Sequence, residues 1–194
     1  MKYTQIPSTA FKSIQLNAGI LLDEFTPSTQ TIGNIIGATS GGVNFTATPE
    51  FSDYGEDIDN CPANMKELKK ITSIEAKMSG TFISVSAELA KTLIGSADID
   101  SADSTHVIPR KDIADADFQD IWWVGDYSDI NTDDGDTHSA GCVAIHLMNA
   151  LSTGGFQIQS SDDAKGTFSF EFTGHFSMDA QDTVPYEIYI IPGK

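Results

Sequence analysis

The sequence predicts a mainly β protein: an antiparallel β-sandwich or barrel with one short flanking helix and a long inter-strand loop. Three observations predict this class. Residues 167–177 alternate, with Phe168, Phe170, Phe172 and Phe176 on one side and mostly polar residues on the other, which is typical of an antiparallel strand with one wet face. Short apolar runs bounded by turn residues recur along the chain. Only one segment carries a helix pattern with a cap at each end.

The predicted strands follow one another in a pattern that favours a sandwich or barrel in a single domain, residues 1–194. In chain order they are residues 14–22, 43–48, 71–85, 121–124, 143–148, 167–177 and 186–191. Pro49 is expected to end the second of them. The third is either one strand or a tight hairpin, with a turn or bulge at Ser79-Gly80.

The single predicted helix begins after Ser86, whose hydroxyl suits an N-terminal cap. Leu89 and Leu93 follow at four-residue spacing, and Gly95 stands where a C-terminal glycine belongs. A helix this short depends on packing for its stability, so both leucines are expected to lie against a sheet.

A long insertion separates the strands predicted at 43–48 and 71–85. It covers about residues 49–70, and loops of this length in compact domains are commonly functional. Its charges are segregated by sign. The acids Asp53, Glu56, Asp57 and Asp59 come first, and the lysines Lys66, Lys69 and Lys70 follow.

The charge balance argues against several function classes. The chain has 11 Lys and Arg against 28 Asp and Glu, a net charge of −17, and its single arginine is Arg110. Nucleic-acid binding needs cations on the phosphates, and adsorption to an anionic membrane needs a basic surface. The sequence predicts neither a signal peptide nor a membrane span. Cys61 and Cys142 are expected to be free thiols, as in a reducing cytoplasm.

No motif predicts catalysis, so the sequence indicates no enzyme, no cofactor and no metal site. The four histidines have no partners at metal-ligand spacing. The segment Asp129–Asp136 resembles the start of an EF-hand loop, but its glycine comes one position late and Ala140 takes the place of the closing glutamate. It is interpreted as a solvated acidic turn. The alternative is a non-enzymatic β-sandwich adhesin or carbohydrate-binding module that uses this loop for calcium.

The order of these features resembles the major tail proteins, or tail tube proteins, of long-tailed bacteriophages. The segments that carry the resemblance are Gly37-Ala-Thr-Ser-Gly-Gly42, Val43-Asn-Phe-Thr-Ala-Thr48, Phe51-Ser-Asp-Tyr-Gly-Glu-Asp-Ile-Asp59, Met78-Ser-Gly-Thr-Phe82, Thr167-Phe-Ser-Phe-Glu-Phe-Thr-Gly-His-Phe176 and Val184-Pro-Tyr-Glu-Ile-Tyr-Ile-Ile191. They span most of the chain.

The resemblance implies a virion protein, assembled in the bacterial host cytoplasm, whose homo-hexameric rings stack into a tube. DNA passes through this tube during ejection without specific binding. The resemblance further implies a tape measure protein and a tail terminator as partners, and a long loop that contacts the next ring. A flexible non-contractile tail and the inner tube of a contractile tail both remain open.

Two sets of candidate residues follow from the resemblance. The polar faces of two long strands offer Ser73, Glu75, Glu171 and Thr173 as lumen-facing residues, with an outer solvated face or a ring–ring contact as the alternative. The acids of the 49–70 loop are expected to meet its lysines on a neighbouring subunit, with pairing inside one loop as the alternative. An acidic wall repels DNA, although acidity also serves solubility alone.

Overall fold

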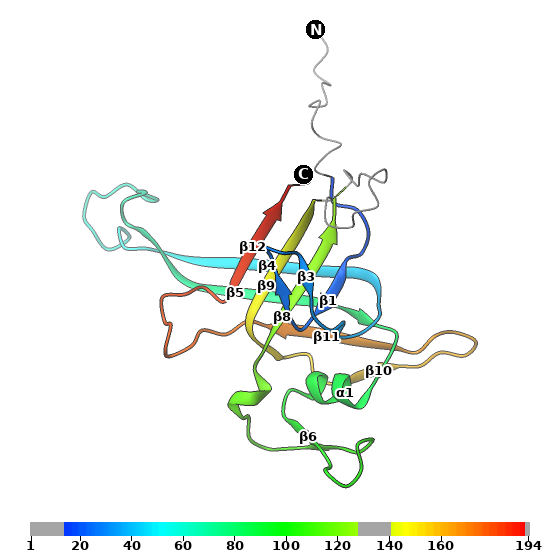
Figure 1. Cartoon of the computed structure of the whole chain (residues 1–194). Helices are drawn as coiled ribbons and strands as arrows, with labels where there is room; N and C mark the ends of the chain where they lie inside the picture. The colour runs from blue at the N-terminus through cyan, green and yellow to red at the C-terminus, as the bar shows by residue number, and fades with distance from the viewer. Residues whose placement is uncertain (1–13, 128–140, 193–194) are drawn as a thin grey trace.

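A computed structural model describes residues 14–127 and 141–192 of the chain (Figure 1). One α-helix, α1 (Ala87–Ile94), and one 3-10 turn, η2 (Asp115–Asp117), accompany the strands in this part of the chain. The strands are β1 (Ile20–Leu22), β2 (Phe25–Thr26), β3 (Thr31–Ile32), β4 (Thr39–Asp53), β5 (Lys69–Phe82), β6 (Ala97–Ile99), β7 (Val107–Pro109), β8 (Gln119–Asp126), β9 (Cys142–Ser152), β10 (Gln157–Gln159), β11 (Thr167–Thr173) and β12 (Tyr186–Ile191).

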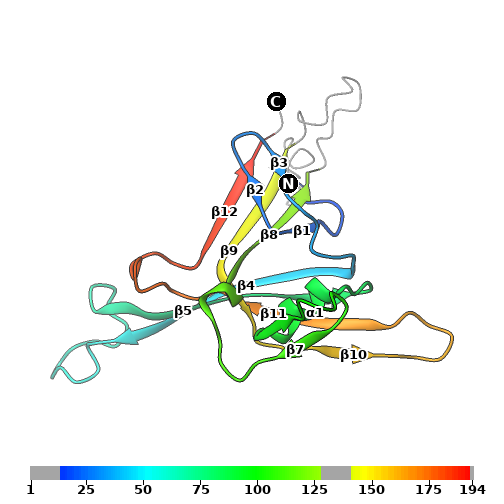
Figure 2. The same ribbon diagram turned by 60° about the horizontal axis from the view of Figure 1, so that its bottom comes forward.

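Two groups of antiparallel strands form the body of the protein. The long sheet has the order β10–β11–β5–β4, and the short sheet has the order β1–β8–β9–β12. A short pairing of β11 with β9 joins them. The strands of the short sheet stand steeply across those of the long sheet in both views (Figures 1 and 2). The predicted mainly β, antiparallel fold with one flanking helix is therefore confirmed.

The core lies between the two sheets. The predicted apolar face of the 167–177 strand is confirmed for Phe168, Phe170 and Phe172, which are buried. The prediction is wrong beyond Thr173, where β11 ends, and Phe176 is 48% exposed. The three buried rings pack with Met78 and Phe82 of β5, and residues of the short sheet close the cluster from the other side. Burying large aromatic side chains supplies much of the free energy that holds such a sandwich together.

Helix α1 has the caps that its sequence predicts. The Leu89 N–H donates to Ser86 Oγ at 3.1 Å. Gly95 ends the helix at φ 80°, a left-handed conformation that glycine adopts without strain. Leu89 and Leu93 are 3% and 0% exposed and belong to the core cluster, so the expected packing against the sheets is confirmed.

Strand β4 is longer than the sequence pattern indicates, and β5 begins and ends earlier than the predicted 71–85. Pro49 does not end β4 but pairs with Ile74 inside it. Proline is tolerated here because β4 is the outer strand of the long sheet, where one row of backbone groups needs no partner. Residues 49–53 and 69–70 of the predicted loop therefore belong to strands, and only residues 54–68 form the turn between them.

The predicted turn or bulge at Ser79-Gly80 is absent from β5, which runs through both residues. The register shifts of this strand pair lie elsewhere, between Thr39 and Val43 of β4 and between Glu50 and Phe51, where Thr72 is the extra residue in β5. Gly80 has a different role: a Cβ there would lie 2.8 Å from Phe170 Cζ, so only glycine lets this ring approach the strand.

Several short elements have too few residues for a readable pattern. The hairpins β2–β3 and β6–β7 and the strand β10 are examples that the sequence analysis missed. The strand predicted at 14–22 is confirmed only in its last three residues, β1. No helix in the described residues is long and apolar enough to cross a membrane.

Candidate functional site: a polar sheet face and a projecting arm

One face of the long sheet is polar from edge to edge. Because residues directly opposite each other in a sheet share a face, the register places its members together. We call the following set the polar face: Asn44, Thr46, Thr48, Glu50, Ser73, Glu75, Lys77, Ser79, Thr81, Gln157, Gln159, Thr167, Ser169, Glu171 and Thr173. The opposite face of the same strands carries the buried phenylalanines and Met78. Within the body the sheet thus separates apolar from polar side chains, whereas farther out Asp53 and Lys69 share the side of Phe51.

All four predicted lumen-facing residues lie on the polar face. Ser73 and Glu75 come from β5, and Glu171 and Thr173 come from β11, where Thr173 is paired with Lys77. Ser73 Oγ donates to a Glu50 carboxylate oxygen at 2.7 Å. The strand pairing therefore assembles one surface from segments that are far apart in the sequence.

Lys77 is the only cation on the polar face. Its Nζ lies 2.9 Å from Glu75 Oε1 and 3.7 Å from Glu171 Oε1. The hydrogen bond to Glu75 raises the pKa of Lys77 above its usual value, and the charge of Glu171 adds to the effect. The ammonium therefore sits between two carboxylates, and Glu50 leaves the face with a net negative charge.

A neighbouring loop residue adds hydrogen bonds to the polar face. Thr153, from the loop after β9, donates to Glu171 Oε1 at 3.1 Å and lies 2.9 Å from the Thr173 hydroxyl. Most members are short hydroxyl or amide residues, and none is a large apolar one. Such a surface is well hydrated and offers a polyanion no adhesive contact.

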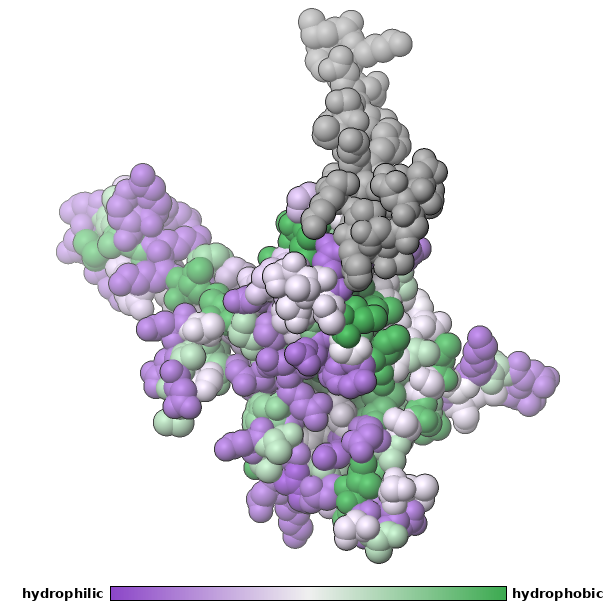
Figure 3. All heavy atoms as spheres, viewed as in Figure 1, coloured by the Kyte–Doolittle hydropathy of each residue, from purple (hydrophilic) through white to green (hydrophobic). Residues whose placement is uncertain are grey.

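The second surface is an arm that projects from the body on one side (Figure 1). We define the arm as residues 49–74, the outer parts of β4 and β5 with the turn between them. Its tip is closed by a Tyr54 N–H bond to the Leu68 carbonyl at 3.1 Å. Figure 3 shows the tip as a largely hydrophilic surface with apolar residues among the polar ones.

One face of the arm is apolar and exposed. It continues the core-facing side of β4 and β5 beyond the body, where the opposed pair Phe51 and Ile71 are 54% and 55% exposed. Tyr54, Ile58 and Met65 add further exposed apolar surface at the tip. Exposed apolar side chains gathered in this way usually mark an interaction surface.

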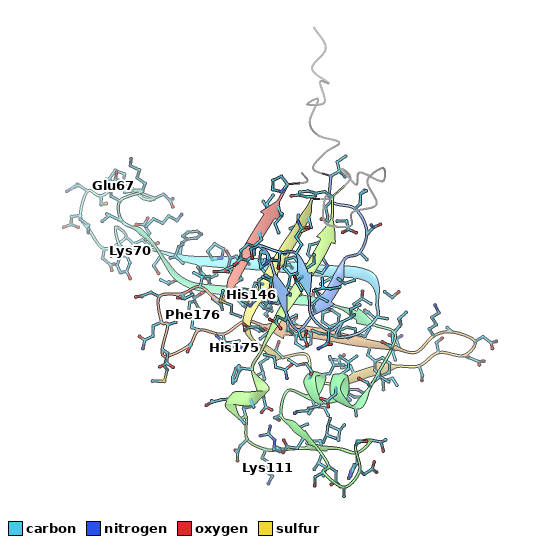
Figure 4. The ribbon with its side chains drawn as sticks, viewed as in Figure 1. Glu67, Lys70, Lys111, His146, His175 and Phe176 are labelled. Carbon is cyan, nitrogen blue, oxygen red and sulfur yellow. The ribbon has the colours of Figure 1, made fainter. Side chains whose placement is uncertain are left out.

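The charges of the arm are placed as follows. Lys69 and Lys70 lie over the rings of Phe51 and Tyr54, at 5.4 and 5.6 Å from Nζ to the ring centre. Lys66 pairs with the adjacent Glu67 at 3.5 Å. Figure 4 shows Glu67 and Lys70 on this arm, away from the body. Glu56, Asp57 and Asp59 are exposed and have no ion pair in the described part of the chain.

Asp53 has a role inside its own arm. Its Oδ1 accepts the Gly55 N–H at 2.9 Å, and its Oδ2 accepts the Asn64 N–H at 2.8 Å. These two backbone bonds, Gly55 first, lower the pKa of Asp53, and the charge of Lys69 also lowers it. The carboxylate therefore ties the two sides of the turn together.

The Asp53→Ala variant is expected to loosen the tip without unfolding the body. Trypsin at pH 8 should cut after Lys66 or Lys69 several-fold faster than in the parent chain, as followed by mass spectrometry. Asp59→Ala is the control, because the Asp59 carboxylate makes no hydrogen bond among the described residues. Equal rates for both variants would show that Asp53 does not hold the tip.

The same variant has an expected pH dependence. The pKa of Asp53 is lowered from 3.8 in the folded state, so its stabilisation is fully present above the unfolded value and is lost as the pH falls through the folded value. Amide hydrogen exchange at Gly55 and Asn64 should therefore differ between parent and Asp53→Ala at neutral pH and converge in acid.

The described residues give no support for a metal site or for chemistry at the histidines and cysteines. No group of three or more metal-ligand side chains exists within residues 14–127 and 141–192. His146 stacks on Trp122 at 3.9 Å, and His175 meets Phe118 edge to face, as expected of packed histidines. Cys61 and Cys142 lie apart as free thiols. The segment Asp129–Asp136 lies outside the described residues.

The sequence analysis missed the β4 part of the polar face. Thr46 and Thr48 lie in the strand predicted at 43–48 but were not proposed as members of this face, and the expectation that Pro49 ends the strand hid Glu50. If Pro49 is placed in an outer strand, where proline is tolerated, the predicted strand extends to Glu50.

Together these surfaces define a class: a mainly β protein with one hydrophilic sheet face and one projecting arm of mixed charge. No protein-family model matches the sequence, and no curated protein matches it. Among solved structures, a chain from the tail of an empty GTA particle, determined by helical refinement with C6 symmetry, is similar with 10% sequence identity. The match covers 82% of this chain and 92% of that chain, with a TM-score of 0.43.

Proposed function

We propose that the chain is a structural subunit of a phage-type tail tube, with the polar face turned towards a central channel. The observation that carries the proposal is the polar face itself, which combines hydroxyl and amide side chains with three glutamates and one lysine. Ser73, Glu75, Glu171 and Thr173 are its channel-facing residues in this proposal.

A channel for DNA works best when its wall does not hold DNA. Each phosphate retained by a lysine or arginine would act as a brake, because such contacts supply most non-specific binding. On the polar face the only lysine is already paired with Glu75. Salt screens charges over about 8 Å at physiological ionic strength. DNA in the channel would therefore respond to the acids of the polar face, and most of the net charge of −17 would be too far away to act on it.

The two edges of the long sheet support the ring in this proposal. Its outer strands, β10 and β4, each pair on one side only in the described residues. Two different edges on one subunit favour a head-to-tail contact, and such contacts close into rings when the rotation allows it. We propose hexameric rings that stack with the arm between rings, and an absence of catalytic and cofactor chemistry. A tape measure protein and a tail terminator are the further partners proposed.

The proposal is tested first by assembly. Negative-stain microscopy of the purified chain at high concentration should show rings or stacked tubes. A monodisperse monomer whose melting temperature rises with calcium would contradict the proposal and favour a calcium-binding module.

Orientation of the polar face is tested by reversing its charge. In tubes of Glu75→Lys/Glu171→Lys, Lys77 loses both partners and the face becomes basic, so these tubes should retain a short DNA duplex at low salt and release it as salt rises. Tubes of the parent chain should not retain it. The control is Glu24→Lys/Asp162→Lys, two exposed acids outside the polar face with the same change in charge. Equal retention by both variants would show that this face does not meet DNA.

A further inference from the structure

A groove on the body lies between the loop of residues 174–185 and the segment that begins with η2. It has a volume of about 620 Å³, and it is lined by Asp115, Phe118, His175, Phe176, Met178 and Asp179 among others. None of these residues belongs to the polar face or to the arm. Figure 4 shows His175 and Phe176 close together in this region. The groove is therefore a third surface, to which the proposed tube assigns no role.

The floor of the groove is fixed by contacts within the body. Asn149 Nδ2 donates to the His175 carbonyl at 3.1 Å, and His175 Nδ1 lies 3.1 Å from the Asn149 carbonyl. Phe118 packs edge to face on the His175 ring at 5.3 Å. Since three separate segments hold the floor in place, it is formed before a partner arrives, and binding does not have to order it.

Strand β9 is irregular beneath the floor. Asn149 has φ 46°, which is uncommon for a residue other than glycine, and the register of β9 with β8 shifts beside it. The Asn149 N–H donates to Asp120 Oδ1 at 3.0 Å, which stabilises this bulge. β-Bulges often lie next to functional sites, where they redirect a side chain. Here the bulged residue supplies the side chain that fixes His175.

The rim of the groove combines apolar side chains with negative charge. Met178 is 88% exposed and Phe176 is 48% exposed, although both are large apolar residues. Asp115 and Asp179 line the same groove, and neither carboxylate has an ion pair within the described residues. Exposed apolar side chains that gather in this way usually mark an interaction surface, and the two acids favour a cationic partner.

The cations that would complement these acids are absent from the groove and from the sequence around it. No lysine or arginine lines the groove. Residues 112–164 and 166–193, which contain all of its lining residues, have no lysine or arginine at all. The positive charge must therefore come from the occupant.

A second copy of this chain is a poor source of that charge. The arm carries only three lysines among six acids. Lys77 lies between two glutamates, and Arg110 is bound to Asp98 and Asp117. Such surfaces bring carboxylates together with their cations, so they gain little from two further acids. An occupant whose cations are not matched by acids fits the groove better.

We infer that the groove lined by Phe176, Met178, Asp115 and Asp179 is a docking site for a different protein, which inserts a short segment of Lys or Arg with apolar neighbours. The two carboxylates bind its cations. Met178 is flexible and Phe176 is exposed, so together they adapt to its apolar side chains. The inference goes beyond the proposed tube, because it concerns a groove of the single chain and a partner that is not a copy of it.

Peptide binding tests the inference at protein concentrations below those of assembly. The probe is fluorescein-Lys-Phe-Lys-Leu-Arg-Phe-amide, followed by fluorescence anisotropy. Asp115→Asn/Asp179→Asn should raise its Kd roughly tenfold or more, and Met178→Ser should raise it severalfold. The matched control, Glu24→Gln/Asp162→Asn, removes two exposed acids outside the groove and should bind the probe as the parent does. Equal weakening in the control, or a parent chain that does not bind the probe, would overturn the inference.

Two further peptides test what the groove selects. A probe with serine at each apolar position and a probe with glutamate at each basic position should both bind at least tenfold more weakly, because each lacks one of the two required properties. Undiminished binding of the serine peptide would show general attraction to an acidic protein and would refute a specific site.

The alternative occupant is tested by sedimentation velocity of the parent chain and Met178→Ser without peptide. Both should show the same degree of self-association at every concentration. If Met178→Ser self-associates less than the parent, the groove receives a second copy, and its assignment to a different protein is wrong.

Discussion

Tubes are expected not to grow from a chain in which Lys66, Lys69 and Lys70 are all replaced by glutamate. The substitutions remove the positive side of the arm and place added negative charge on a chain that already carries −17. If the arm meets acids of a neighbouring copy, each contact changes from attraction to repulsion, and the cost is repeated for every subunit added. Sedimentation of assembled material and negative-stain microscopy measure the effect.

The fold of this variant is expected to stay intact, because Lys66, Lys69 and Lys70 are all exposed and surface substitutions usually change stability by about 0.5 kcal/mol or less. The matched comparison is Lys69→Glu/Lys70→Glu against Lys111→Glu/Lys165→Glu, which alters two exposed lysines outside the arm. The Lys111→Glu/Lys165→Glu variant should assemble normally. Tubes of normal length from the triple variant would contradict the role of the arm in assembly.

Replacing Arg110 by Met is expected to lower the free energy of unfolding by about 3 kcal/mol. Two guanidinium bonds join Arg110 to Asp117, whose side chain is 5% exposed, at 2.5 and 2.7 Å. Arg110 Nε lies 2.8 Å from Asp98 Oδ2, and Nη1 donates to the Asp112 carbonyl at 3.1 Å. Arg110 thus ties the β6–β7 hairpin to η2, and its loss leaves a buried carboxylate without its cation.

Urea unfolding of Arg110→Met beside Lys111→Met measures this effect. Lys111 is the next residue and is exposed (Figure 4), so its replacement should change stability by about 0.5 kcal/mol or less. Arg110→Lys should recover only part of the loss, because one ammonium cannot replace the separate contacts of Nε with Asp98, Nη1 with Asp112 and Nη2 with Asp117. Equal stabilities of the Met variants at positions 110 and 111 would refute the role assigned to Arg110.

The effect of Arg110→Met is expected to depend on pH. Burial acts to raise the pKa of Asp117, but the Ala114 N–H and then Arg110 outweigh it, and the pKa is lowered from 3.8. The stabilisation is therefore fully present above the unfolded value and is lost as the pH falls through the folded value. The stability difference between parent and variant should shrink in acid.

The elements that were predicted well have strong local signals. Alternation predicted β11 and its buried face, and β12 has the predicted bounds 186–191. Ser86 and Gly95 predicted both ends of α1. These signals are local because the period of a strand and the caps of a helix depend on residues close in sequence.

The arm shows where local signals fail. Pro49 is a valid strand breaker inside a sheet, but whether a strand lies at the edge depends on what pairs beside it. The contacts of Lys69 with Phe51 and of Lys70 with Tyr54, one on each face of the arm, likewise exist only because β4 and β5 pair. The charge segregation of the loop was visible in the sequence, but its apolar face was not.

The sequence by itself determined the mainly β class, the faces of the long strands, the capped helix and the acidic balance that argues against a DNA-gripping surface. Only the tertiary structure decided that Ser73 and Glu75 share a face with Glu171 and Thr173, that Lys77 stands between two glutamates, and that Arg110 holds Asp117. The physical reason is that alternation specifies which side chains of one strand point the same way, whereas the neighbours of a strand follow from the packing of the whole core.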